Sequence, residues 1–439
     1  MRDLFLDLAG YAFGLLHGSE VLLANFSGEA SDFIRFNQGR VRQPMSVRQA
    51  YLTLQLIDGR RHDRTTLALA GGAEDRDAIA AAIAAMRSDL PGLPEDPYLL
   101  FSSDAGTTQT ERGGTLPSPA EAIDRLAAAG LGLDMVGVLA SGPVYRGFAS
   151  SLGARHWHEV DSFLLDWSVY QGGDKAVKAS FAGQHWDADE VARRVDATRA
   201  QLPYLARSPR SIAPGDYRAY VSPAALDELL WLLNWGGVSA KEQRTQQSTI
   251  QQLVDGDLSL SPQVTLREHT ANGLAPAFDE VGFTRPPVVD LIRAGQHAGS
   301  LVSPRTAQEY GIESNGAGES ESMQAMELAP GRLPRADALR ALDTGVYVGN
   351  FHYLNWSDRS AARVTGMTRF ATYWVEGGEI VAPLSVMRFD DSLYRMLGSE
   401  LEALDDEADW ILNSGTYDGR SVETSRVPGA LLKQLRLTL

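Results

Sequence analysis

The chain of 439 residues contains no cysteine. This absence excludes disulfides, thiolate metal sites and a cysteine nucleophile, and it is typical of a reducing compartment. Basic residues are also scarce, because 40 Lys and Arg stand against 56 Asp and Glu, a formal net charge of −16. No run of five basic residues occurs. We therefore expect no nucleic-acid partner and no attraction to an anionic membrane surface.

Long apolar runs are missing as well. No segment approaches the ~20 consecutive apolar residues that a membrane-spanning helix needs. The apolar N-terminus, residues 1–18, is interrupted by Asp3 and Asp7, and its leucines recur at helical spacing. This pattern favours an amphipathic helix over a signal peptide. The sequence therefore predicts a cytoplasmic protein.

The order of patterns along the chain indicates helices mixed with antiparallel strands. Alternating apolar and polar residues predict a meander of strands up to Leu69, with a tight hairpin at Asp58 and Gly59. Further strands are expected over 133–183, and the C-terminal end is rich in strand-like runs. Helices are predicted over 74–90, 118–130 and 187–206, and a Pro- and Gly-rich connection over 91–119.

A stretch rich in Pro and Ser near residue 210 predicts two domains, 1–209 and 210–439. Because no regular βαβ rhythm occurs, the expected class is α+β. The N-terminal domain is expected to combine helices with an antiparallel or mixed sheet, and the C-terminal domain to be β-rich. The polar tract over 311–333 predicts a mobile, solvated loop.

Motifs that carry chemistry are few. His156 and His158 would face the same side of a strand, so they are a weak candidate pair of metal ligands. Ser151 lies in a relaxed nucleophile-elbow pattern, but a strand rather than a helix is predicted after it, which favours a turn residue. Neither the dinucleotide-binding nor the P-loop glycine pattern is present.

An aromatic and arginine-rich stretch over 351–374 has a composition typical of interfaces and of sites that grip a peptide. The alternative is a sheet core with ordinary surface arginines. The candidate contacts to a peptide or partner are Tyr353, Trp356, Arg359, Arg363 and Arg369.

The order of segments resembles the TldD/PmbA family, which comprises TldD metallopeptidases and their TldE (PmbA) partners. The resemblance starts with "FIRFNQGRVRQ" and "LTLQLIDGRR" and continues with "YVSPAALDELLWLL". It extends through "FDEVGFTR", "DLIRAGQHAGSLVSPRTAQEYGIESNG" and "YWVEGGEIVAPLSVMRFDDSLYRML". "FDEVG" and "WVEGGEI" are similar to the TldE versions in particular. Where TldE chains usually have "TGD(Y/F)S", this chain has "TGMTRF", which indicates a divergent subgroup.

The resemblance implies a role in proteolysis. In the TldD branch, the helix that matches residues 225–237 carries H-E-x-x-x-H, whose two His bind zinc while a distant Cys completes the site. Here this helix has no His and the chain has no Cys, although Glu228 is present. The resemblance therefore implies a non-catalytic, TldE-like subunit of a heterodimeric zinc metallopeptidase that processes small unfolded peptides. Zinc is expected in the TldD-like partner, and neither a catalytic residue nor a metal ligand is expected in this chain.

Two alternatives stay open at this point. In the first alternative, the chain is a homodimeric peptide-binding or regulatory protein without peptidase activity. In the second, it is an independent hydrolase that uses His156 and His158. A neighbouring reading frame with H-E-x-x-x-H and a late Cys would favour the peptidase complex.

Overall fold

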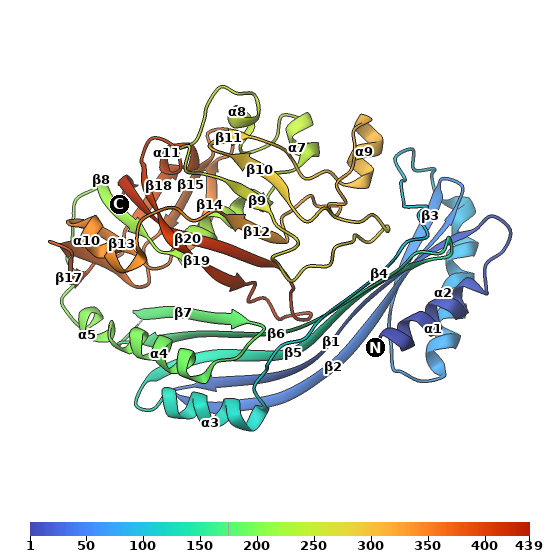
Figure 1. Cartoon of the computed structure of the whole chain (residues 1–439), viewed down its shortest axis with the longest axis horizontal. Coiled ribbons are helices and arrows are strands. Elements are labelled where there is room, and N and C mark those ends of the chain that lie inside the picture. Colours follow the sequence, from blue (N-terminus) through green and yellow to red (C-terminus); the bar gives the residue numbers. More distant parts are fainter. Residues whose placement is uncertain (174) are drawn as a thin grey trace.

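Two β-sheets, each accompanied by helices, organise the chain and confirm the α+β prediction (Figure 1). The structure is a computed structural model that describes residues 1–173 and 175–439. The first sheet has seven strands in the order β3-β2-β1-β5-β6-β4, with β7 paired to the second half of β6. The second sheet has 13 strands and contains the C-terminal strand β20 near its centre. Among the described residues, no helix has the length and apolarity needed to cross a membrane.

The strands of the first sheet are β1 (Val21–Asn37), β2 (Arg40–Asp58), β3 (Arg61–Ala68), β4 (Thr107–Arg112), β5 (Asp134–Ser150), β6 (Arg155–Tyr170) and β7 (Ala176–Gly183). Its helices are α1 (Arg2–Phe13), α2 (Glu74–Asp89), α3 (Pro119–Ala129), α4 (Ala188–Arg199) and α5 (Leu202–Leu205), with a 3₁₀ turn, η1 (Leu90–Gly92).

The strands of the second sheet are β8 (Gly215–Val221), β9 (Leu266–Glu268), β10 (Val289–Arg293), β11 (Gln296–His297), β12 (Ala325–Leu328), β13 (Gly345–Val348), β14 (His352–Asp358), β15 (Arg363–Met367), β16 (Thr372–Glu376), β17 (Glu379–Pro383), β18 (Arg388–Ser392), β19 (Leu401–Leu412) and β20 (Thr424–Leu437). The helical elements of this half are α6 (Pro223–Leu230), η2 (Trp231–Asn234), α7 (Ala240–Arg244), α8 (Gln251–Val254), α9 (Pro304–Tyr310), η3 (Arg335–Asp337), α10 (Ala338–Leu342) and α11 (Leu393–Met396).

The strands β5 and β6 of the first sheet are largely buried on both faces, and β6 shows how they separate two layers. Because side chains alternate across a strand, Phe163 and Trp167 point to one face, where they pack with α3 and α4. Leu164 points to the opposite face and packs against Leu412 of β19. The second half of the molecule therefore lies on the face of the first sheet that does not carry the helices (Figure 1).

Most predicted elements of the N-terminal half are confirmed, including the hairpin, since β2 ends at Asp58 and Gly59 has a φ of +63°. The Pro- and Gly-rich connection predicted over 91–119 contains one strand that the sequence pattern did not indicate. Residues Thr107–Arg112 form β4, which pairs in parallel with β6. The segment is polar and short, and it becomes a strand through this pairing. The proposed boundary at residue 210 falls between α5 and β8 and stays a prediction.

The polar tract over 311–333 is also more ordered than predicted. Glu321 is 2% exposed, and its carboxylate accepts hydrogen bonds from the Ser239 hydroxyl and from the backbone N–H groups of Lys241 and Ser303. A carboxylate with three donors is stable inside a protein. The tract is thus tied to the starts of α7 and α9 and is not a solvated linker.

Candidate functional site, a cavity between the two sheets

Helix α6 begins immediately after β8, and local sequence sets its start. The Ser222 hydroxyl accepts a hydrogen bond from the Ala225 N–H at 3.2 Å, and Pro223 occupies the first helical position. The helix covers less of the predicted 225–237 segment than expected, because it tightens into the 3₁₀ turn η2 at Trp231. Asp227, Glu228 and Trp231 line a cavity that residues of the first sheet also line.

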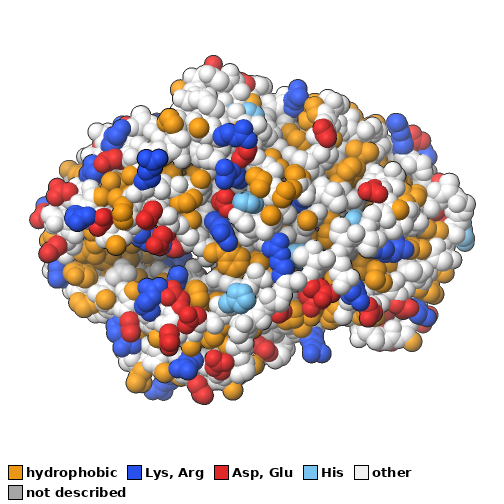
Figure 2. Space-filling view, viewed as in Figure 1, with side chains coloured by type: hydrophobic (Ala, Val, Ile, Leu, Met, Phe, Trp, Pro, Cys, Tyr) orange, Lys and Arg blue, Asp and Glu red, His pale blue; other side chains and the backbone are white. Residues whose placement is uncertain are grey.

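A cavity of about 270 Å³ lies between α6, β6, β7 and the end of β19. It is lined by Leu164, Asp166, Lys178, Ala179, Ser180, Ala224, Asp227, Glu228, Trp231, Asn350, Ile411, Leu412, Asn413 and Ser414. Figure 2 shows the surface hollowed between the two halves of the molecule. Such a concave site with a few converging polar groups is the usual form of a small-molecule site.

Asp227 lies at the floor of this cavity and is 7% exposed. Its Oδ1 accepts a hydrogen bond from the Ser425 hydroxyl at 2.5 Å. Burial, aided by the neighbouring Glu228 charge and opposed by the hydrogen bond from Ser425, raises the pKa of Asp227 to about 7. The side chain therefore exchanges its proton near neutral pH.

Glu228 connects α6 to the loop that follows β13. Its Oε2 accepts a hydrogen bond from the backbone N–H of Phe351 at 2.7 Å, and its Oε1 accepts one from the Asn350 amide at 3.2 Å. Burial raises the pKa of Glu228, whereas these donors and the Lys178 charge lower it. The carboxylate is thus held in one orientation at the cavity wall.

Asp166 and Lys178 approach the same cavity from the first sheet. In the β6–β7 pairing, Asp166 is opposite Ser180 and Lys178 is opposite Ser168, so both side chains occupy the face turned toward α6. Burial raises the pKa of Asp166, and the charge of Lys178 opposes this effect. The cavity wall thus combines three carboxyl groups with one ammonium group.

Zinc would not fit these residues. Structural and catalytic zinc sites use His and Cys in most of their positions, and α6 offers two carboxylates that are already hydrogen-bonded. Across residues 1–173 and 175–439, no group of three or more His, Asp or Glu side chains is arranged to hold a metal ion. We therefore derive no metal-dependent step in this chain.

His156 and His158 do share one face of β6, as predicted, but they lie away from the cavity. The His156 ring stacks between Phe148 and Phe278, and its Nδ1 lies 2.8 Å from the Thr108 hydroxyl. The His158 Nε2 donates to the Leu274 carbonyl at 2.8 Å, and burial lowers the pKa of His158 to about 4. The two rings pack between the two halves of the molecule. No third possible metal ligand lies close to both of them among the described residues. Their role as metal ligands stays a prediction.

Ser151 is the turn residue that the sequence predicts. It lies between β5 and β6, and its hydroxyl accepts a hydrogen bond from the Leu22 N–H at 3.0 Å.

The "FDEVGFTR" segment forms a tight loop that fastens the second half of the molecule to the first. The Asp279 carboxylate accepts hydrogen bonds from the N–H groups of Val281 and Phe283, which shapes the loop. The Glu280 carbonyl then accepts a hydrogen bond from the Asn25 amide in β1 at 2.8 Å. The loop is an interdomain contact and does not line the cavity.

Gly282 provides a test of this contact. It has a φ of +91°, and a Cβ at this position would lie 2.6 Å from the Phe148 ring. We expect Gly282→Ala to lower the free energy of unfolding by about 2 to 4 kcal/mol through backbone strain and overpacking. Gly59→Ala is the matched control, since Gly59 has a similar positive φ but open space around it, and it should cost about 1 kcal/mol. Equal losses in chemical denaturation would contradict the assignment.

The five predicted contact residues lie on or near β14 and β15, and most of them bind within the protein. The Arg359 guanidinium donates to the Trp235 carbonyl at 2.8 Å, and Arg363 donates to the Asp390 carboxylate at 3.1 Å. The Arg369 Nη1 lies 3.3 Å from the His352 Nε2. Trp356 is half-buried against the core of the second half. Tyr353 is 82% exposed, with a φ of +58°, and Arg359 is exposed as well.

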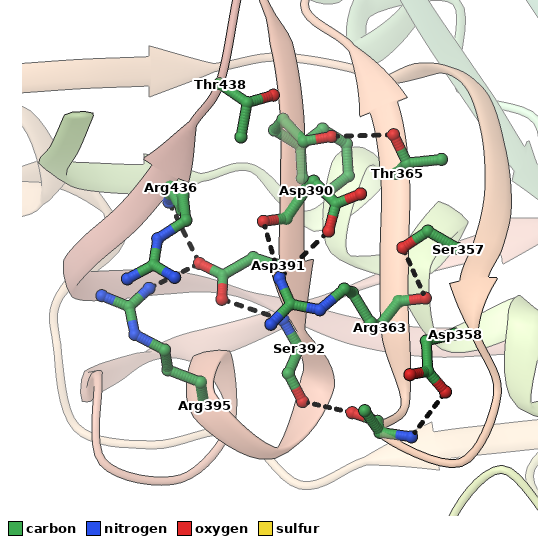
Figure 3. Close-up of polar contacts among 12 residues, drawn as sticks. Ser357, Asp358, Arg363, Thr365, Asp390, Asp391, Ser392, Arg395, Arg436 and Thr438 are labelled. Carbon is green, nitrogen blue, oxygen red and sulfur yellow. Dashed lines mark hydrogen bonds and ion pairs between the residues drawn. The ribbon is translucent and has the colours of Figure 1, made fainter. Parts of the chain in front are cut away.

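A polar network surrounds Arg363 and explains its orientation (Figure 3). The side chain points from β15 toward Asp390 of the neighbouring strand β18. The adjacent Asp391 accepts from Arg395 at 2.6 Å and from the backbone N–H of Arg436 at 3.0 Å. Arg363 thus links β15 to β18, while Asp391 links β18 to α11 and β20.

Sequence reasoning identified α6 but missed two cavity residues, Asp166 and Lys178. Their signal was a charged side chain inside otherwise apolar strands, "FLLDW" and "AVKAS". Only the fold shows that both lie opposite α6.

Comparisons with known proteins identify the family. The PmbA/TldA metallopeptidase C-terminal domain matches residues 214–438, slightly more than half of the chain. No curated protein is significantly similar in sequence.

Solved structures share the fold over the whole length. A candidate modulator of DNA gyrase from Thermotoga maritima has 14% identity and a TM-score of 0.77, covering 99% of this chain and 100% of its own. A TldE from Thermococcus kodakarensis has 13% identity and a TM-score of 0.78, with the same coverage of 99% and 100%. A candidate modulator of DNA gyrase from Bacteroides thetaiotaomicron has 15% identity and a TM-score of 0.74, covering 100% of this chain and 98% of its own. With its second half matched by the family's C-terminal domain, the chain belongs to the PmbA/TldD metallopeptidase family.

Proposed function

We propose that this chain is the TldE-like, non-catalytic subunit of a heterodimeric zinc metallopeptidase. The observation that carries the proposal is the composition of α6, which presents Asp227 and Glu228 to a cavity but no His. A TldD-like partner with H-E-x-x-x-H would hold the zinc, and this chain would complete the chamber and position small unfolded peptides. The resulting complex would act in peptide maturation or leader removal in the cytoplasm.

Tyr353 is the proposed contact residue that the structure supports best. It projects from β14, which among the described residues pairs only with β15 and so forms an edge of the sheet. Exposed aromatic side chains at such an edge are common in interfaces. Trp356, Arg359, Arg363 and Arg369 would act mainly by holding this hairpin in place.

The test is reconstitution with a TldD-like protein encoded near this one. We expect the purified chain alone to leave unfolded peptides intact and the co-expressed pair to elute together and cleave them in a chelator-sensitive way. Tyr353→Ala should weaken the pair or its peptide affinity, whereas Tyr417→Ala, at a fully exposed loop position, should change neither. Chelator-sensitive cleavage by the isolated chain would overturn the proposal. A stable homodimer that never binds the partner would favour the regulatory protein instead.

A further inference from the structure

The cavity beside α6 contains two opposite charges that have no partner of their own. The Asp166 carboxylate makes no hydrogen bond or ion pair with any residue in 1–173 and 175–439. Within the same ranges, the Lys178 ammonium makes no ion pair, and its described contact is the Phe370 ring, 5.0 Å from the nitrogen. Both side chains are partly buried, and charged groups that lose contact with water usually pair. These two are left available toward the cavity.

Asp166 and Lys178 lie on neighbouring strands but do not form an ion pair with each other. Asp166 and Lys178 are diagonal neighbours on adjacent strands, since Asp166 is opposite Ser180 and Lys178 is opposite Ser168. Diagonal neighbours are roughly 7–8 Å apart at the backbone, so long side chains can meet there. Here they do not form an ion pair, although the charge of Lys178 acts on both Asp166 and Glu228. The space between the groups belongs to the cavity.

The remaining lining residues provide both a negatively charged group and hydrogen-bond donors. Glu228 adds a second carboxylate, held in place by Asn350 and by the Phe351 N–H. The rim carries the exposed side chains of Asn413 and Ser414, which can donate hydrogen bonds. The apolar lining residues between these groups would accept a small side chain.

We propose that this cavity binds a small zwitterion of the amino acid or dipeptide class, with its ammonium group at Asp166 and Glu228 and its carboxylate at Lys178. The proposal goes beyond the subunit role, because the ligand site is formed by this chain alone. Charge-assisted hydrogen bonds at both ends would select against molecules that lack either charge. Trp231 would close one side of the site.

The experiment is calorimetric titration of the isolated full-length chain with alanylalanine, N-acetyl-alanylalanine and alanylalanine amide. We expect alanylalanine to bind, and loss of either terminal charge to weaken binding by about tenfold or more. Asp166→Asn and Lys178→Met should each have an effect of the same size on alanylalanine. Lys241→Met, which removes an exposed charge from α7, is the matched control and should leave binding unchanged.

Two results would overturn the inference. The first is no heat of binding with millimolar alanylalanine, and the second is equal binding of all three compounds. The ligand series uses the unmodified chain, so a folding defect in a variant does not affect it. Because no partner is present, failure here leaves the proposed subunit role standing, and failure of the partner experiment leaves this site standing.

Discussion

Arg420→Met will lower the free energy of unfolding by about 3 to 5 kcal/mol, the size expected when a buried charge loses its counterpart. Arg420 is 4% exposed and lies in the loop between β19 and β20. Its guanidinium donates to the Gly142 carbonyl at 2.7 Å and to the Ser162 carbonyl and hydroxyl at 2.7 and 2.6 Å. Removing it leaves these acceptors without a donor, and such groups are costly when buried.

The charge on Glu29 makes the loss larger. Glu29 is 3% exposed in β1 and, with Asp161, provides the negative field around Arg420. Burial lowers the pKa of Arg420 to about 10, while the charges of Glu29 and Asp161 favour its charged form. The guanidinium therefore stays charged at neutral pH, and in the methionine variant the buried Glu29 loses one of its two nearby positive charges, the other being Arg146.

A double-mutant cycle separates these contributions. Glu29→Gln in the Arg420→Met background should recover part of the lost stability, because it removes a buried negative charge that Arg420 no longer offsets. Arg426→Met is the matched control on β20, where the side chain is exposed, and it should change stability by no more than about 0.5 kcal/mol. A loss below about 1 kcal/mol for Arg420→Met in urea denaturation would show that the loop does not fasten the two halves together.

Asp227→Asn will raise the free energy of unfolding at pH 8 by about 1 to 3 kcal/mol, provided that asparagine keeps the hydrogen bond from Ser425. Burial raises the pKa of Asp227 from 3.8 to about 7, so the folded protein keeps this proton at a pH where the unfolded chain has lost it. The contribution of Asp227 to stability therefore falls as pH rises from about 4 to about 7. The substitution should therefore raise the free energy of unfolding by the full amount above pH 7 and by little at pH 4.

Asp124→Asn on α3 is the matched control, because this carboxylate is exposed, and it should have little effect at either pH. Urea denaturation at pH 4 and pH 8 gives the change in the free energy of unfolding for each of the two variants at each pH. A gain that is equal at both pH values, or a loss at pH 8, would contradict the raised pKa. A buried carboxylate such as Asp227 that lowers the free energy of unfolding and lines a cavity is expected at a ligand site.

Local patterns predicted much of the fold because they depend on neighbours in sequence. The alternation through residue 69, the turn at Gly59 and the helix predicted over 118–130, which is α3, all follow from such rules. By contrast, β4 is a polar segment that depends on pairing with β6, and Glu321 is buried only because three distant donors surround it. Neither condition can be read from local composition.

The candidate site was predicted only in part for the same reason. Helix α6 stood out through its resemblance to the H-E-x-x-x-H helix, and its lack of His could be read directly. The cavity also needs Asp166 and Lys178 from β6 and β7, which lie far from α6 in sequence and form no motif with it. The buried Arg420 likewise follows from the docking of one loop onto the first sheet.

The most direct test of the subunit role is the zinc content of the chain purified alone and of the complex with a TldD-like partner, measured by mass spectrometry of the metal. The account predicts no stoichiometric zinc in the isolated chain and about one zinc per pair, bound by the H-E-x-x-x-H subunit. About one zinc per isolated chain, lost when His156 and His158 are both changed to alanine, would contradict the account and make this chain a metal-binding protein in its own right.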